Sequence, residues 1–163
     1  MLFNKPVSNP MLAGAIELMV TEPTPEHKRT FLEEILKSEL LCPAFINPPP
    51  EIDESGIPRL GDNTKVQIPT LYTPEGVQYF LAFTDKEELY KWKSEEECPY
   101  TYACSFDDFV MLLRHREPDG SPGPAQGVVI NPCGCNYVLD KDKVANILVT
   151  RELSIMEREE KNN

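Results

Sequence analysis

The chain has 163 residues, the size of one ordinary domain, so a single hydrophobic core is expected. Its 27 acidic and 16 basic residues give a formal net charge of -11, and such a field repels phosphate backbones and anionic lipid head groups. Nucleic acid and membrane surfaces are therefore excluded as expected partners.

Two helix-start signals open the chain. Asn9-Pro10 and Thr24-Pro25 each place a capping residue before a proline at the first helical position. Apolar residues at helical spacing then predict two core-facing helices that form a hairpin. The residues predicted to face the core are Leu12, Ala15, Ile16, Met19 and Val20 in the first helix, and Phe31, Leu32, Ile35 and Leu36 in the second.

A short apolar run and a long polar segment follow. Residues 40–46 end at consecutive prolines, which predicts a buried strand that stops there. Pro43 within this run indicates an edge position or a bulge, because proline has no N–H to donate to a ladder. Residues 47–64, rich in proline and acidic side chains, show no periodicity and predict a long surface loop.

The middle of the chain predicts a hairpin followed by a helix. Residues 65–72 and 77–83 are strand-like and are joined through Gly76, where a positive φ is expected. The second strand is apolar on both faces and should be central in the sheet. Thr84 and Glu87 have the spacing of a capping box, which predicts a helix that turns Leu89 and Trp92 inward.

The C-terminal half predicts alternating strands and helices. Residues 100–104 read as a short strand, and Ser105 opens a helix whose Phe106, Phe109, Val110 and Leu113 share one face. A turn-rich loop over 117–124 leads to residues 127–149, which read as strand, sharp turn, strand and helix. The charged residues 151–163 can extend the last helix, pack on a neighbouring subunit or fray.

Several local phrases occur in a fixed order between residues 9 and 149. They are Asn9-Pro10-Met11-Leu12, Leu41-Cys42-Pro43, residues 80–92, Phe106-Asp107-Asp108-Phe109 and residues 127–132. In their order and spacing they resemble the N-terminal domain family of SseB, the enhanced serine sensitivity protein. The resemblance implies a compact mixed α/β domain of the bacterial cytoplasm. It supplies no catalytic residues, because no biochemical activity is established for the family.

Together these patterns predict one domain of mixed α+β class. We expect a central mixed sheet of about five to six strands, with the N-terminal helical hairpin and further helices packed on it. The SseB-like domain is assigned to residues 1–150, with the loop 47–64 inside it, and residues 151–163 form a charged C-terminal tail.

The cysteines are expected to be reduced thiols. There are five of them, an odd number, and a compact chain of this length needs no disulfides to fold, which indicates a cytoplasmic protein. The N-terminus lacks the layout of a signal peptide, and no apolar run reaches membrane-spanning length. Cys133-Gly134-Cys135 is the one suggestive pair, as a thiol or metal site, although a zinc site needs about four ligands. We expect no metal and no cofactor.

Four residues are candidates for binding: Arg59 in the loop, Arg114 and His115 at a helix end, and Asn131 at a turn. The cations at the helix end can hold an anionic ligand or acidic partner, or they can simply complement the helix dipole. Asn131 can equally serve to build its turn.

No catalytic residue is expected. The chain has no Gly-rich phosphate loop, no His-Glu-x-x-His and no Gly-x-Ser-x-Gly. We therefore predict a non-catalytic binding or regulatory domain that acts on a protein partner or small ligand through residues 47–63 and the exposed strand ends. The alternative is a small enzyme or thiol-dependent factor centred on Cys133 and Cys135, and self-association through the C-terminal tail is also open.

Overall fold

The computed structural model describes residues 1–55 and 57–161, and this part of the chain is of mixed α+β class, as predicted. Its helices are α1 (Pro10–Thr21), α2 (Pro25–Lys37), α3 (Lys86–Trp92), α4 (Phe106–Leu113) and α5 (Lys141–Lys161). Its strands are β1 (Leu2–Phe3), β2 (Glu39–Asn47), β3 (Glu51–Ile52), β4 (Pro58–Arg59), β5 (Lys65–Gln67), β6 (Thr70–Tyr72), β7 (Gln78–Ala82), β8 (Tyr100–Ser105), β9 (Ala125–Ile130) and β10 (Tyr137–Asp140).

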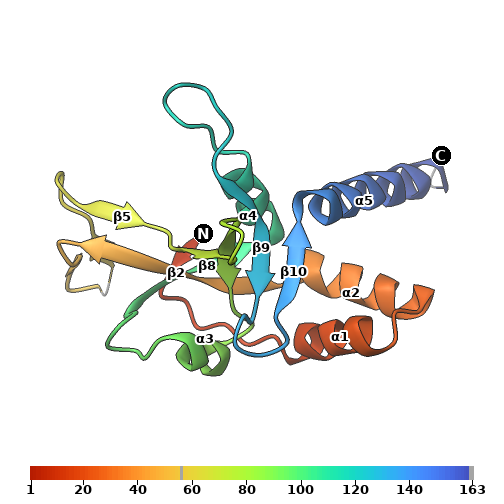
Figure 1. Ribbon diagram of the computed structural model, residues 1–163, viewed down its shortest axis with the longest axis horizontal. Coiled ribbons are helices and arrows are strands. Elements are labelled where there is room, and N and C mark those ends of the chain that lie inside the picture. The colour runs from red at the N-terminus through yellow and green to blue at the C-terminus, as the bar shows by residue number, and fades with distance from the viewer. Residues whose placement is uncertain (56, 162–163) are drawn as a thin grey trace.

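A mixed sheet forms the centre of the molecule (Figure 1). Two ladders, ordered β1-β8-β2-β5 and β10-β9-β7-β6, are joined where Leu41 and Phe83 exchange backbone hydrogen bonds of 2.8 and 2.9 Å. The order across the joined sheet is β1-β8-β2-β7-β9-β10, in which only β7 and β9 are parallel. The strand at residues 77–83 is therefore central, as its two apolar faces predict.

Both faces of this sheet are buried. Successive strand residues point to opposite faces, so on β9 Val128 and Ile130 enter a larger core while Val129 enters a smaller one. The larger core includes buried residues of α1, α2, α4 and α5, and the smaller one includes Leu89 of α3. Strands buried on both faces read as continuous apolar runs, which explains the pattern of residues 127–130.

The predicted helical hairpin is confirmed, because α1 and α2 pack against one another. Thr24 caps α2 by accepting a hydrogen bond from the N–H of His27 at 3.2 Å. Val20 was wrongly assigned to the core: its side chain is 58% exposed. Leu12, Ala15 and Ile16 already fill the buried face of α1, and Val20 lies outside it.

Asn9 does not cap α1 with its side chain. Its Nδ2 donates instead to the backbone carbonyls of Glu39 and Thr84, at 2.6 and 3.0 Å. A residue predicted to stabilise one helix locally therefore links the start of that helix to the ends of two strands.

The cap of α3 lies one residue later than predicted. Asp85 is the capping residue, and its Oδ1 accepts from the N–H of Glu88 at 2.9 Å. Thr84, which was expected to cap, is fully buried. The inward direction of the helix is confirmed, because Leu89 is buried and Trp92 stacks on Phe83 with ring centroids 5.9 Å apart.

Pro43 lies inside the sheet rather than at its edge, and β2 explains why this is tolerated. On one side β2 pairs with β8 through residues 39–44. On the other side it pairs with β7 only at Leu41 and then with β5 from Phe45 onward. Pro43 falls where β2 changes partner, so its missing N–H removes no ladder hydrogen bond.

Residues 65–72 form two strands and not one. The strand is interrupted at Ile68 and Pro69. Before this point β5 pairs with β2, and after it β6 pairs with β7. The β6–β7 hairpin is as predicted, with Gly76 at φ 82°. The division follows from Pro69, which cannot donate to a ladder.

The loop after β2 has more order than its sequence indicates. β2 and β5 extend away from the body as an arm at the left of Figure 1, and the short strands β3 and β4 pair within this segment. Asp53 organises the turn between them, because its Oδ1 accepts from the N–H groups of Ser55 and Ile57 at 2.9 Å each. Gly56, in the same predicted loop, lies outside the described residues.

The C-terminal elements follow the prediction. Ser105 and Asp108 form a capping box that opens α4. β9, β10 and α5 succeed one another, and a Cβ on Gly127 would lie 2.2 Å from the carbonyl oxygen of Leu139, so glycine permits the close approach of β9 and β10. α5 continues to Lys161, and the domain boundary at residue 150 stays a prediction.

Candidate functional site

The four predicted binding residues do not form one site. Arg59 lies on β4, where its Nε is 3.2 Å from Oδ2 of Asp53. Arg114 and His115 follow α4, and Asn131 begins the turn after β9. Figure 1 shows the arm, the loop after α4 and the turn after β9 at different ends of the molecule.

Asn131 is a structural residue. It is 3% exposed, its Oδ1 accepts from the backbone N–H of Thr84 at 3.0 Å, and its Nδ2 donates to Oγ1 of Thr84 at 2.9 Å. Its own N–H donates to the carbonyl of Ala82 at 2.9 Å. These contacts occupy its carboxamide and leave it buried, so it is not available to a ligand.

Cys133 and Cys135 are exposed on the same turn. Partial burial, and to a lesser extent the charge of Glu88, raises the pKa of the Cys135 thiol above its usual value. Reactive cysteines require the opposite shift, because the thiolate is the nucleophile. This direction of shift does not favour Cys135 as the nucleophile of the thiol-based alternative.

The turn also lacks a metal-ligand set. Among residues 1–55 and 57–161, no group of three or more His, Cys, Asp or Glu side chains is placed to hold a metal ion. Glu88 lies against the turn, since a Cβ on Gly134 would be 2.3 Å from its Oε2. A larger residue at position 134 would therefore require the end of the Glu88 side chain to move.

A shallow hollow of about 380 Å³ lies beside Arg114 and His115. Its other lining residues are Leu113, Arg116 and Pro122. Nη1 of Arg116 donates to the carbonyl of Gly120 at 2.8 Å and so holds the loop. Arg114 and His115 are exposed at the end of α4, where cations complement the helix dipole.

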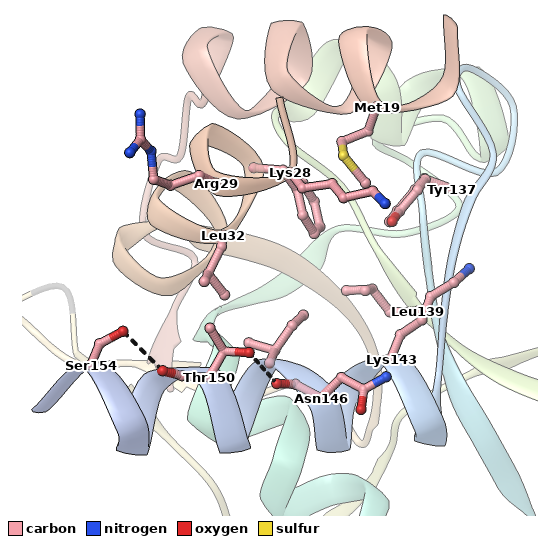
Figure 2. Close-up of a pocket in the computed structure, with 12 residues that line it drawn as sticks. Met19, Lys28, Arg29, Leu32, Tyr137, Leu139, Lys143, Asn146, Thr150 and Ser154 are labelled. Carbon is pink, nitrogen blue, oxygen red and sulfur yellow. Dashed lines mark hydrogen bonds between the residues drawn. The ribbon is translucent and has the colours of Figure 1, made fainter. Parts of the chain in front are cut away.

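A larger groove, of about 660 Å³, lies between α2 and α5 (Figure 2). β10 borders it at one end, and Met19 of α1 reaches it from above in the view. The residues that line it are Met19, Lys28, Arg29, Phe31, Leu32, Tyr137, Leu139, Lys143, Asn146, Ile147, Thr150 and Ser154. Elements from both ends of the chain thus build one surface.

The floor of this groove is apolar and rigidly packed. Phe31 and Tyr137 meet edge to face with centroids 5.2 Å apart, and Leu139 and Ile147 are buried beside them. Such aromatic pairs contribute about 0.5–1.5 kcal/mol beyond their burial. Burial raises the pKa of Tyr137, and the nearby Asp140 adds to this shift, so its phenol stays protonated at neutral pH.

The two hydroxyl groups of the α5 wall are hydrogen-bonded to their own helix. Oγ1 of Thr150 donates to the carbonyl of Asn146, and Oγ of Ser154 donates to that of Thr150, at 2.9 Å each. Both bonds are drawn in Figure 2. Hydroxyls engaged with their own helix need no partner from a ligand, so an apolar surface can pack against this wall at little desolvation cost.

Three cations, Lys28, Arg29 and Lys143, line the rim. Neither Lys28 nor Arg29 forms an ion pair with any residue that the structure describes, and Lys28 extends across the groove toward Tyr137 in Figure 2. No described residue that lines the groove is acidic. In a chain of net charge -11, the lining residues are thus locally cationic, with Nζ of Lys143 lying 4.0 Å from Oδ2 of Asp140 at one end.

Lys143 also contacts the backbone at the edge of the sheet. Its Nζ donates to the carbonyl of Val138 at 2.8 Å and lies 5.3 Å from the ring centroid of Tyr137. β10 pairs with only one of the described strands, β9, and Lys143 occupies a carbonyl on its open side.

Fold and surface together define a small mixed α+β domain that carries an open groove between two helices. The family model of the SseB protein N-terminal domain matches residues 12–146, and the chain belongs to this family. No curated protein and no solved structure matches the chain. Within the described part of the chain, no helix has the length and apolar character needed to cross a membrane.

Proposed function

We propose that this domain is a non-catalytic protein-binding module, and that its groove receives an apolar helix with acidic flanks. The observation that carries this proposal is the pairing of an apolar floor, formed by Phe31, Leu139 and Ile147, with a rim of three cations and no acid among the described lining residues. Amphipathic helices dock by laying an apolar face into such a groove.

The walls favour a helix over an extended strand. α2 and α5 border the groove along its length, so a third helix would pack between them as in a bundle. Strand addition requires open backbone groups on β10, and Lys143 already holds the carbonyl of Val138 there. A charged lysine at a strand edge opposes pairing with another strand.

The cations give selectivity more than affinity. An exposed ion pair contributes about 0.2–1 kcal/mol, whereas burying one aliphatic anchor contributes about 1.5–3 kcal/mol. The apolar floor would thus supply most of the binding free energy, and the rim would select against basic helices. A cytoplasmic setting is part of the proposal and is supported by the five free cysteines.

The test is a titration of the intact protein with two synthetic helical peptides. Both carry leucines along one face; one has glutamates beside the leucines and the other has lysines. We expect the acidic peptide to bind more tightly than the basic one, with backbone NMR shifts centred on Leu32, Tyr137 and Thr150. Lys28→Glu/Arg29→Glu should weaken binding about tenfold or more, by losing two rim pairs and adding repulsion.

The matched control is Lys65→Glu/Arg114→Glu, which makes the same change in net charge at two exposed positions outside the groove. It should leave the affinity within about twofold, apart from long-range effects that salt screens. Equal losses in both variants, or shifts centred on the loop after α4, would refute the groove as the binding surface.

A further inference from the structure

The outer half of α5 carries an unpartnered apolar stripe. Val149, Leu153 and Met156 are 57%, 55% and 57% exposed. At about 100° per residue they lie about 180–240° around the helix from Ile147, which faces the groove. The α5 residues that line the groove point on average about 45° from Ile147 toward the stripe, so the stripe lies about 110° around the helix from the groove wall and faces away from the body.

Several charges on this half of α5 are divided between the stripe and the side of the helix that faces the body. By the helical period, Glu152, Glu159 and Glu160 fall beside the stripe, whereas Arg151 and Arg158 fall on the side toward the body. The direction of Arg151 is confirmed by its contact with α4: its Nη1 donates hydrogen bonds to both carboxylate oxygens of Asp107, at 2.8 and 3.0 Å. The exposed side is thus apolar with acidic flanks.

This side complements the groove of the same chain. The groove offers an apolar floor with a cationic rim, and the stripe offers apolar side chains with an anionic border. Figure 1 shows α5 running outward from β10, away from the sheet and on the same side as the α1–α2 hairpin, and its stripe is exposed there.

We propose that the groove of one copy receives the outer half of α5 from a second copy. This inference rests on the proposed function, since it names an occupant for the same groove. A single contact of this kind joins two different surfaces, and it leaves one groove and one stripe of the pair free for further contacts. Because the stripe faces away from Val144 and Ile147, the buried residues of α5, the body of the second copy lies behind its stripe and does not enter the groove.

The assembly is weak and reversible. Three apolar anchors on one helix bury less surface than the roughly 1,200–2,000 Å² typical of stable complexes. Self-association therefore depends on protein concentration. A partner helix that fills the groove competes with the α5 stripe of another copy. Self-association would therefore occupy the groove until such a partner displaces the stripe.

The test uses two variants of the intact chain in sedimentation equilibrium at low salt. The groove variant is Lys28→Glu/Arg29→Glu, which suits the first turns of α2, where acids are favoured. The stripe variant is Val149→Gln/Leu153→Gln/Met156→Gln, since glutamine keeps a high helix propensity. The control, Met11→Gln/Met111→Gln, removes two apolar side chains that are 67% and 63% exposed on other helices.

We expect the wild type and the control to associate with concentration and each variant alone to remain monomeric. An equimolar mixture of the two variants should form a 1:1 dimer and stop there, because the groove variant still offers its stripe and the stripe variant its groove. A mixture that stays monomeric, or a stripe variant that associates like the wild type, would overturn the inference.

Binding of the acidic peptide distinguishes the self-association proposal from the proposed helix-binding function on which it rests. If the wild type is monomeric at all concentrations but binds the peptide in the groove, self-docking is wrong and the binding function stands. If the chain neither associates nor binds the peptide, both are wrong. Circular dichroism of each variant confirms that α5 is retained.

Discussion

Asn131 uses both ends of its carboxamide on a single residue, Thr84, which lies 47 positions earlier in the chain. The pair joins the end of β9 to the segment between β7 and α3, and Asn9 donates to the carbonyl of the same threonine. Three distant segments therefore meet at one buried residue, and the stability of that junction can be measured.

Replacing Asn131 should be costly for two separable reasons. Asn131→Ala leaves the buried N–H of Thr84 unpaired, at about 1–3 kcal/mol, and places alanine at φ 50°, at about 1–2 kcal/mol. Asn136→Ala is the matched control, because Asn136 has φ 47° but is exposed. Urea unfolding should show a larger loss for Asn131→Ala, and equal losses would contradict a role for its hydrogen bonds.

Gly127 and Gly14 should respond to alanine with opposite signs. At Gly127 the new Cβ would lie 2.2 Å from the Leu139 carbonyl and 2.8 Å from Cα of Asp140, so β10 must shift and several kcal/mol should be lost, as for other overpacked sites. At Gly14, inside α1, nothing lies within 4 Å, and alanine should add about 0.5–1 kcal/mol. Thermal unfolding of the two variants measures both changes in stability. A Gly127→Ala variant as stable as the wild type would contradict the requirement for glycine where β9 lies close to β10.

Thiol labelling should divide the cysteines into two classes. Cys133 and Cys135 are exposed, whereas the other three are buried. We expect two thiols to react with a disulfide reagent in the folded protein and all five only after unfolding. Cys133→Ser should leave one accessible thiol. A third fast thiol in the native protein would mean that the β2–β8 region opens more readily than its packing indicates.

Stability should fall at alkaline pH because of the thiols. A hydrogen bond with Cys104, together with burial, raises the pKa of Cys42 well above its usual value, and burial raises that of Cys98. The unfolded chain releases these protons near about pH 8.5, while the folded chain retains them. Their stabilising contribution is therefore complete below that pH and is lost as the pH rises through the folded values.

The measurement is urea unfolding between about pH 7 and pH 9, below the tyrosine midpoint of about 10. Each retained proton contributes a slope of up to about 1.4 kcal/mol per pH unit. Cys42→Ala should reduce the slope, and Cys133→Ser, for an exposed thiol, serves as the comparison. Parallel curves for the wild type and Cys42→Ala would exclude Cys42 as the cause.

Features that depend on residues close together in the sequence, such as helix starts, were predicted most accurately. The capping box of Ser105 and Asp108 depends on residues three apart, so its chemistry is visible in the chain itself. Thr84 carried the same type of signal and misled the prediction, because a distant residue, Asn131, engages it and leaves Asp85 to cap. Tertiary contacts also decided the role of Asn9 and the tolerance of Pro43 inside the sheet.

The groove could not be predicted in this way. Its residues come from four elements that span Met19 to Ser154, and its apolar floor forms only when β10 lies beside α2 and α5. One signal was available: Lys143, Ile147, Thr150 and Ser154 fall at helical spacing and form a face that is neither fully apolar nor fully charged. The sequence placed cations of interest at Arg59 and Arg114, where charge clusters or turns are visible, and missed Lys28, Arg29 and Lys143.

Lys143 also determines how the sheet ends. β10 borders an apolar groove and has an open side, the combination from which fibrous aggregates grow by adding strand after strand. The ammonium group on the Val138 carbonyl interrupts that route while leaving the groove accessible to a helix. A single lysine thus keeps a surface that is suited to binding from becoming a template for aggregation.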